Sequence, residues 1–437
     1  MSNTLVSVRT DLSVLPVGTP ATRYVLVTLT APEAPRRKGR QPVDVAFVLD
    51  RSGSMGGGKI RLAREAIRQA LGMLRHDDGF SLVVYDDEVD LLVPAAPASP
   101  EARRNALKRL ADVEARGSTD LAGGWMAGCR ALGAADPPSA EGEATGKAFS
   151  RRCLLLTDGL ANVGITDADE LATRAGATRR QHIVTSTFGV GADFDEVLLQ
   201  RMADEGGGHF YFIETPAQIT DLLTSELGEA LEVVARGASL ALQLPTGVRA
   251  VPLTRLEHCV TDGGIRIGLG DLVSGQEVQV VIRLDFPARA DGQSMTVRFV
   301  AADRDGGLAV APHGVTWTAL AVPRTLRPRR DRVVDRAVAG LYAAKARHEA
   351  VAMNRAGAFD QARALLVATA ARIRSYAGHD PQLIAIARRL VEETEQFGAA
   401  MDALSQKAVH FAAYAVMRSR TADGKAQRRP PRGETQS

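Results

Sequence analysis

The sequence contains few cysteines and lacks any long apolar segment. Its three cysteines, Cys129, Cys153 and Cys259, are far apart and odd in number, which excludes a disulfide-rich scaffold and a zinc-type ligand spacing. We therefore expect all three to be reduced, buried thiols of a cytoplasmic protein. No stretch of about 18 apolar residues occurs, so the sequence predicts no membrane-spanning helix.

A secretion signal and a strong net charge are also missing. Met1 to Asp11 contain no basic segment followed by an apolar run, so we expect no signal peptide. The net charge of +3 is too small to indicate a nucleic-acid or membrane partner. Basic residues gather instead around 324–332 and in the tail, which we interpret over 419–437 as a disordered, solvated end.

The middle of the chain, residues 43–235, alternates between apolar strands and helical patterns. The expected strands are 43–49, 80–85, 89–93, 153–157, 183–189 and 208–213, and the expected helices are 60–74, 100–114, 120–133, 168–180, 194–204 and 216–235. Near-continuous apolar strands are typical of a parallel sheet covered by helices on both faces. The pattern predicts an α/β fold with a doubly wound, mostly parallel six-stranded sheet of order 3-2-1-4-5-6. The third strand is expected to be antiparallel, because the tight link at Asp86-Asp87 suggests a hairpin.

The flanking regions have other rhythms, and the length of the chain predicts about two or three domains. Two strands within 1–35 are expected to join five strands within 237–322 in a β-sandwich that the α/β domain interrupts. The expected strands are 5–8, 24–29, 240–244, 264–269, 277–284, 295–301 and 316–322. Residues 331–418 predict a bundle of three or four helices. Residues 354–362 resemble the turn of a tetratricopeptide repeat, but a single copy favours a plain bundle.

An oxygen-rich motif follows the first buried strand. Asp50, Ser52 and Ser54 alternate along one loop, while Thr119 precedes a helix and Asp158 ends another buried strand. Hydroxyl and carboxylate oxygens suit a hard cation such as Mg²⁺ or Mn²⁺ far better than zinc. In the predicted sheet these loops meet where the strand order reverses, which is where ligands bind in such folds. The sequence therefore predicts one divalent-metal site.

The five residues, in this order and after these elements, resemble the metal-ion-dependent adhesion site of von Willebrand factor A-like domains. The resemblance covers about residues 43–232. It implies that Ser52 and Ser54 coordinate the metal directly and that Thr119 does so directly or through water. It also implies that Asp50 and Asp158 act largely through waters. The implied ion is Mg²⁺ or Mn²⁺, with Ca²⁺ as a further candidate, and its open position takes an Asp or Glu from a partner.

The resemblance implies a binding module of a bacterial cytoplasmic type rather than an enzyme. We expect a protein partner that offers an acidic residue, and a partner ATPase is a further candidate from the family. No small-molecule substrate, nucleic acid or membrane insertion is expected. His182 and His209 flank strands without a nucleophile at a recognised spacing, so we interpret both as structural or surface residues.

Two alternative functions stay open from the sequence. The segment Gly53–Lys59 fits the Gly-x4-Gly-Lys part of a nucleotide-binding P-loop, but Ile60 stands where a P-loop has Ser or Thr. A P-loop-like nucleotide hydrolase is thus one alternative, and we otherwise interpret Gly56-Gly57-Gly58 as a flexible rim of the metal site. The other alternative is a structural subunit in which the metal only stabilises the fold.

Overall fold

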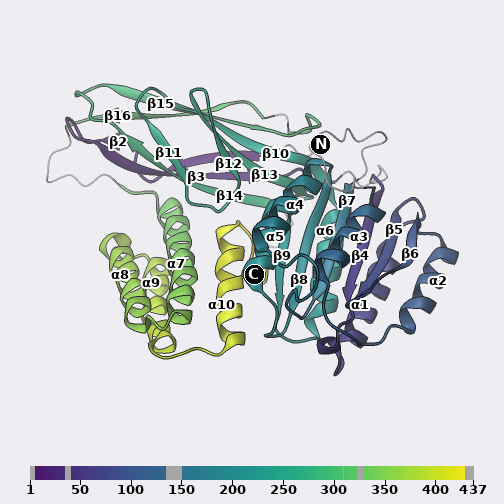
Figure 1. Ribbon diagram of the computed structural model, residues 1–437. Helices are drawn as coiled ribbons and strands as arrows, with labels where there is room; N and C mark the ends of the chain where they lie inside the picture. The colour runs from purple at the N-terminus through teal and green to yellow at the C-terminus, as the bar shows by residue number, and fades with distance from the viewer. Residues whose placement is uncertain (1–4, 35–40, 134–149, 309, 322–328, 429–437) are drawn as a thin grey trace, which may run out of the picture. The chain divides into compact units, whose positions relative to one another are not determined.

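The chain folds into two compact units, each described here by itself (Figure 1). The computed structural model describes residues 5–34, 41–133, 150–308, 310–321 and 329–428. The α/β unit comprises Arg37–Glu232, and the sandwich–helix unit comprises Met1–Arg36 with Val233–Ser437. Within the described residues, no helix is both long enough and apolar enough to cross a bilayer.

The α/β unit is built on one six-stranded sheet in the order β6-β5-β4-β7-β8-β9. Its strands are β4 (Val43–Asp50), β5 (Gly79–Tyr85), β6 (Val89–Pro97), β7 (Ser150–Thr157), β8 (Ile183–Val190) and β9 (Gly207–Ile213). All neighbours are parallel except β5 and β6, which are antiparallel. The predicted fold class, the order 3-2-1-4-5-6 and the antiparallel third strand are confirmed.

Helices cover both faces of this sheet (Figure 1). They are α1 (Lys59–Met73), α2 (Pro100–Ala111), α3 (Leu121–Ala131), α4 (Ala168–Arg180), α5 (Glu196–Gly206) and α6 (Gln218–Leu231), and a short 3₁₀ turn η1 (Gly53–Met55) follows β4. Two glycines let α3 approach the sheet closely. A Cβ at Gly128 would lie 2.3 Å from Val48 Cγ2, and one at Gly124 would lie 2.4 Å from the Tyr85 ring. This close packing fixes α3, whose N-terminus carries part of the predicted site.

The sandwich–helix unit contains two sheets, with strand orders β1-β3-β14-β11 and β12-β13-β10-β15-β16-β2. The strands are β1 (Leu5–Thr10), β2 (Val14–Leu15), β3 (Ala21–Thr30), β10 (Val233–Gln243), β11 (Arg249–Pro252), β12 (His258–Thr261), β13 (Gly264–Val273), β14 (Glu277–Phe286), β15 (Ser294–Ala302) and β16 (His313–Ala319). Phe286, Phe299 and Trp317 are buried in its core. The N-terminal strands thus lie in the same two sheets as the strands after residue 233, while β2, β11 and β12 were not predicted.

The helices of this unit are α7 (Arg332–Arg355), α8 (Phe359–Ala377), α9 (Pro381–Glu392) and α10 (Ala403–Met417), with a 3₁₀ segment η2 (Glu393–Gly398). Helix α7 packs on the smaller sheet, where Val334 and Val338 share a buried cluster with Leu26 and Val281. The helical bundle and the sandwich therefore share one compact unit.

Two sequence-based expectations about this unit are wrong. The predicted disordered tail is ordered over 419–428, because Ser419 Oγ accepts the N–H of Gln279 at 2.7 Å and Gln427 O accepts the N–H of Glu277 at 2.8 Å. The remainder, 429–437, lies outside the described residues. Cys259 is exposed, because β12 is an edge strand with both faces open, whereas Cys129 and Cys153 are buried free thiols as expected.

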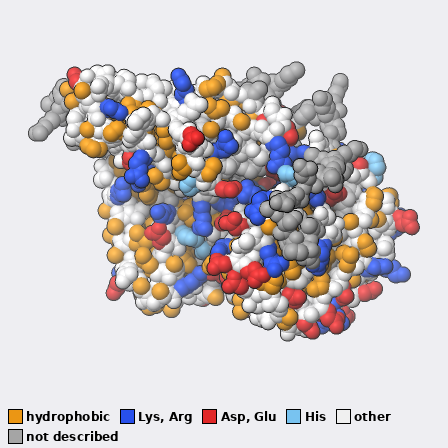
Figure 2. Space-filling model, turned by 45° about the horizontal axis from the view of Figure 1, so that its top comes forward, with side chains coloured by type: hydrophobic (Ala, Val, Ile, Leu, Met, Phe, Trp, Pro, Cys, Tyr) orange, Lys and Arg blue, Asp and Glu red, His pale blue; other side chains and the backbone are white. Residues whose placement is uncertain are grey.

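One face of the molecule shows how exposed apolar side chains are distributed. On the face in Figure 2, hydrophobic side chains lie among charged ones. Such exposure is ordinary for folded domains, because polar groups do not cover their whole surface.

Candidate metal centre

Asp50 lies at the carboxyl end of β4 with both carboxylate oxygens hydrogen-bonded. Ser52 N donates to Oδ1 at 2.7 Å, and Thr157 Oγ1 donates to Oδ2 at 2.6 Å. Asp50 and Thr157 are fully buried. Burial raises the pKa of Asp50 to about 6, and the hydrogen bonds from Ser52 and Thr157 limit that rise. The carboxylate is thus oriented rigidly and has little contact with bulk water.

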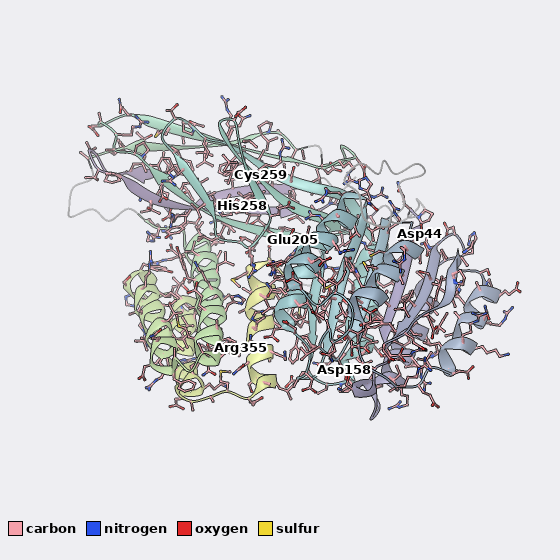
Figure 3. The ribbon with its side chains drawn as sticks, viewed as in Figure 1. Asp44, Asp158, Glu205, His258, Cys259 and Arg355 are labelled. Carbon is pink, nitrogen blue, oxygen red and sulfur yellow. The ribbon has the colours of Figure 1, made fainter. Side chains whose placement is uncertain are left out.

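Asp158 lies at the carboxyl end of the neighbouring strand β7. It connects the loop after β7 to the loop after β4, which carries Ser52 and Ser54. Ser54 Oγ donates to Asp158 Oδ1 at 2.6 Å, and the two hydroxyls of Ser52 and Ser54 are 3.1 Å apart. Asp158 is fully buried, whereas Ser54 is exposed. Figure 3 shows Asp158 at the end of the sheet opposite to Asp44, which lies near the start of β4. Ser52, Ser54 and Asp158 are therefore linked by direct contacts.

Thr119 reaches the same place from the loop before α3. A Cβ on Gly159 would lie 3.1 Å from Thr119 Oγ1 and 3.6 Å from Ser54 Oγ, so the two hydroxyls converge over the Gly159 backbone. Thr119 is buried, and its carbonyl accepts the N–H groups of Asn162 and Val163. The structure thus brings all five predicted ligand residues together.

The side chain between the first two ligand residues has a structural role that the sequence reading missed. Arg51 is buried, and its guanidinium donates to Asp86 at 3.2 Å and to Asp90 at 2.6 Å. Arg116 also donates to Asp86, at 2.7 Å, and its N–H donates to Arg51 O at 2.7 Å. These contacts tie the Asp50 loop to the turn after β5 and to the segment before Thr119.

The electrostatics of Asp86 fit this role as an anchor. Burial by itself would raise the pKa of Asp86, but hydrogen bonds from Glu88 N, Arg51 and Arg116 outweigh it and lower the pKa. Asp86 O also accepts the N–H of Asp120 at 2.7 Å. The sequence signal that could have revealed this network is Arg51 within the Asp50 loop together with the paired aspartates Asp86-Asp87 after the next strand.

Asp120 follows Thr119 and caps α3. Its Oδ1 accepts the N–H of Gly123 at 2.9 Å, which is the usual arrangement of an N-cap aspartate. This contact fixes the start of the helix at Leu121, two residues after Thr119. Asp120 therefore positions Thr119 through the backbone.

The donor set can be tested against the implied ion. Three hydroxyls and two carboxylates converge, and the two carboxylates of Asp50 and Asp158 are fully buried. Buried carboxylates need a cationic partner, and all-oxygen donors match Mg²⁺, Mn²⁺ or Ca²⁺. The absence of a side chain at Gly159 leaves the space between Thr119 and Ser54 open. The residues fit a hard divalent cation.

The glycine-rich segment beside the site is not arranged as a phosphate cradle. The N–H groups of Gly53, Met55 and Gly56 donate to the carbonyls of Gly117, Ser52 and Gly53. A P-loop instead directs successive backbone N–H groups at phosphate oxygens. Lys59 Nζ lies 2.5 Å from Asp158 Oδ2, so the lysine is paired with a predicted metal ligand. From the sequence, Lys59 is predicted only as part of the P-loop alternative, and its pairing with Asp158 is seen only in the structure.

Comparison with known proteins identifies the α/β unit. Residues 44–225 match the sequence model of the von Willebrand factor type A domain. The chain contains a von Willebrand factor type A (VWA) domain. YfbK of Escherichia coli K12 is 28% identical over 255 residues, which are 55% of this chain and 41% of YfbK. Inter-alpha-trypsin inhibitor heavy chain H1 of Bos taurus is 30% identical over 181 residues, which are 40% of this chain and 19% of that protein. The chain thus spans well under half the length of these relatives.

Two solved structures share the fold of nearly the whole chain. A von Willebrand factor type A protein from Catenulispora acidiphila aligns with a TM-score of 0.66 at 17% identity, covering 98% of both chains. The ArnB paralog VWA2 from Sulfolobus acidocaldarius aligns with a TM-score of 0.56 at 14% identity, covering 98% of this chain and 100% of that one. At these identities the likeness shows the fold alone.

A second group of ionisable side chains in the VWA domain is accounted for by packing. His209, Glu226 and Glu229 have ligand atoms within 4.8 Å of one another. Glu226 accepts hydrogen bonds from Ser186 at 2.6 Å and from Tyr211 at 2.7 Å, and it lies 3.1 Å from His209 Nδ1. Glu226 is thus held in a buried hydrogen-bond network. The geometry agrees with the prediction that His209 is structural.

Proposed function

We propose that the VWA domain is a metal-dependent protein-binding module. In this proposal Asp50, Ser52, Ser54, Thr119 and Asp158 hold one divalent cation, Mg²⁺ in the first place and Mn²⁺ or Ca²⁺ as alternatives. The cation then captures an Asp or Glu side chain of a partner protein. The observation that carries the proposal is the convergence of three hydroxyls and two buried carboxylates at the carboxyl ends of β4 and β7.

The chemistry of the donors supports an acidic ligand. Neutral hydroxyls of Ser52, Ser54 and Thr119 donate little negative charge, so an ion held by them retains a strong attraction for an additional carboxylate. Similarity to inter-alpha-trypsin inhibitor heavy chains, whose name makes them chains of a larger inhibitor, is consistent with binding other polypeptides. A cytoplasmic location, a bacterial source and a partner ATPase stay predictions from the sequence.

We propose no enzymatic activity for this site. The P-loop-like alternative is disfavoured because the N–H groups of Gly53, Met55 and Gly56 are used within the loops. It is further disfavoured because Lys59 is paired with Asp158. Steady-state nucleotide hydrolysis that disappears in Lys59→Ala but persists in Ser52→Ala would reverse this choice.

Metal binding is tested by calorimetry with Mg²⁺ and Mn²⁺. We expect Asp50→Ala to abolish measurable binding, because it removes one of two buried carboxylates from the site. Asp77→Ala is the matched control, since Asp77 is exposed and precedes β5, at the amino ends of the parallel strands and away from the site. Equal metal affinity in the wild type and Asp50→Ala would overturn the proposal.

Partner capture separates binding from a purely structural metal. The full chain is immobilised and exposed to lysate with Mg²⁺ or with EDTA, and captured proteins are identified by mass spectrometry. We expect a partner that is lost with EDTA and whose capture fails when its contacting Asp or Glu is changed to Asn or Gln. If EDTA lowers the melting temperature but leaves capture unchanged, the structural alternative is correct.

A further inference from the structure

One cationic side chain lies directly against the candidate metal centre. Within the described residues, Lys59 is the cation that forms an ion pair with a predicted ligand, at 2.5 Å from Asp158 Oδ2. Its side chain is 23% exposed, and its ammonium also lies over the backbone of Gly191, where a Cβ would be 3.8 Å from Nζ. The lysine is thus confined between β7 and the loop after β8.

The other nearby guanidinium groups are used elsewhere. Arg51 is paired with Asp86 and Asp90, and Arg116 is paired with Asp86 and Glu88. Within the part of the chain that the structure describes, neither arginine is ion-paired with Asp50 or Asp158. Of these three cationic side chains, Lys59 is therefore the one whose charge lies in contact with a predicted metal ligand.

The position of Lys59 in its helix is electrostatically unfavourable by itself. Lys59 is the first residue of α1, and a helix N-terminus carries a partial positive charge that favours acidic residues. Helices α2, α4 and α5 follow that rule with acidic residues in their first turns. The ion pair with Asp158 therefore offsets the unfavourable interaction between the lysine charge and the helix N-terminus.

The two oxygens of Asp158 face different partners. Oδ1 accepts from Ser54 Oγ at 2.6 Å, and Oδ2 is paired with Lys59. The lysine thus pairs with the oxygen that does not accept from Ser54. Ser54 and Lys59 share this carboxylate through different oxygens, so a cation held beside Ser54 would lie near a carboxylate that Lys59 also contacts.

Counting charges shows what the lysine changes. Asp50 and Asp158 supply two negative charges, and a divalent cation supplies two positive ones, so without Lys59 the loaded site is neutral. With Lys59 the loaded site has a net charge of one positive unit, which one incoming carboxylate neutralises. The same positive charge opposes the binding of the metal itself.

We propose that Lys59 is a specificity-determining residue that keeps the metal-loaded site positively charged, an inference that rests on the proposed function. Lys59 thereby lowers the intrinsic affinity for the divalent cation and raises the affinity of the loaded site for a carboxylate. The ligand class selected in this way is a singly charged acidic side chain rather than a neutral amide or hydroxyl.

The test measures metal and carboxylate affinity separately in the full chain. Calorimetry gives the affinity for Mg²⁺, and water-proton relaxation of the Mn²⁺-loaded protein gives the affinity for acetate at constant ionic strength, with acetamide as the neutral probe. In Lys59→Met we expect Mg²⁺ to bind about tenfold more tightly and acetate about fivefold more weakly, because one charge within contact distance is removed. Lys59→Arg should stay closer to the wild type in both values.

Arg61→Met is the matched control. It removes one positive charge from an exposed position of the same helix, and we expect both affinities to change by less than about twofold because exposed charges are screened by solvent. Lys59→Gln replaces Lys59→Met if the latter does not fold, as judged by circular dichroism.

The inference predicts that replacing Lys59 changes the Mg²⁺ affinity and the acetate affinity in opposite directions. If Lys59→Met and Lys59→Gln weaken both affinities, Lys59 only supports the structure of the site and the inference is wrong. If both affinities stay within about twofold of the wild type, a threshold that separates the expected changes from screened surface effects, the inference is also wrong. If the wild type binds no Mg²⁺ at all, the proposed function itself fails, which is a different result.

Discussion

The two ends of the VWA sheet both carry aspartates, but they use them differently. At the amino end of the strands, Asp78 is buried, and its carboxylate accepts the N–H groups of Val43 at 3.1 Å and Arg75 at 2.6 Å. These are backbone groups near the starts of β4 and β5. The carboxylate joins the starts of two neighbouring strands, which is a structural task.

At the carboxyl end, the aspartates contact side chains from distant loops. Asp50 accepts from Thr157, 107 residues away, and Asp158 accepts from Ser54 and Lys59, 104 and 99 residues away. Hydroxyls and an ammonium contact these carboxylates, in addition to the Ser52 N–H that Asp50 accepts. The difference indicates that a buried carboxylate is a candidate ligand where exchangeable side-chain groups contact it and not only backbone donors.

The largest expected effect comes from replacing one buried aspartate at each end of the sheet, Asp158 and Asp78, with alanine. Asp158→Ala should weaken Mg²⁺ binding by more than about a hundredfold, because it removes one of the two buried negative charges of the site. Asp78→Ala should leave Mg²⁺ affinity unchanged but lower the free energy of unfolding by about 2–3 kcal/mol, because two N–H groups lose their acceptor. Calorimetry and urea unfolding measure the two quantities. Loss of metal affinity in Asp78→Ala would remove the distinction between the two ends.

The carboxyl end of the sheet should also make the stability of the metal-free protein depend on pH. The pKa of Asp50 is raised to about 6 in the folded state, above its ordinary value of 3.8. The folded state then holds a proton that the unfolded state has released, so stability falls as pH rises from about 4 to about 6 and levels off above that range. The expected loss is about 2–3 kcal/mol.

Urea unfolding in EDTA at several pH values measures this slope. Asp50→Asn should reduce it, since the amide does not titrate, while Asp77→Asn at the amino end should leave it unchanged. Burial also raises the pKa of Asp44, so part of the slope should remain. An equally steep slope in Asp50→Asn would assign the titration to other groups. Bound Mg²⁺ should reverse the trend, because the cation stabilises the ionised carboxylate.

Much of the VWA domain was predictable because its signals are local. The apolar strands end in Asp50 and Asp158, and parallel strands bring their carboxyl ends to one edge. The partner of Lys59 was not predictable in this way, because it depends on a side-chain contact across 99 residues. Arg51 was hidden for the same reason, since its acceptors Asp86 and Asp90 lie on another strand pair.

The sandwich shows where local patterns fail. Strands β11 and β12 have four residues each and little burial, with every residue of β12 exposed. Without a buried face there is no alternation to detect. The tail was misjudged because its basic composition suggests solvation, whereas Ser419 and Arg420 are buried by contacts that composition does not encode. Strong periodicity predicts elements, but the pairing of short edge segments requires tertiary structure.

The smallest expected effect concerns the backbone between the hydroxyl donors. Gly159→Ala adds a Cβ at 3.1 Å from Thr119 Oγ1, so this hydroxyl must move by a few tenths of an ångström, while Ser54 Oγ at 3.6 Å stays in ordinary van der Waals contact. We expect Mg²⁺ affinity to fall about tenfold with little change in the unfolding free energy, since metal binding depends on closely held donor positions. Gly72→Ala in α1, where a Cβ meets nothing within 4 Å, is the control. If calorimetry shows equal Mg²⁺ affinity in Gly159→Ala and the wild type, Thr119 and Ser54 do not hold the metal together, and the carboxyl end of the sheet would be no better a ligand site than the amino end.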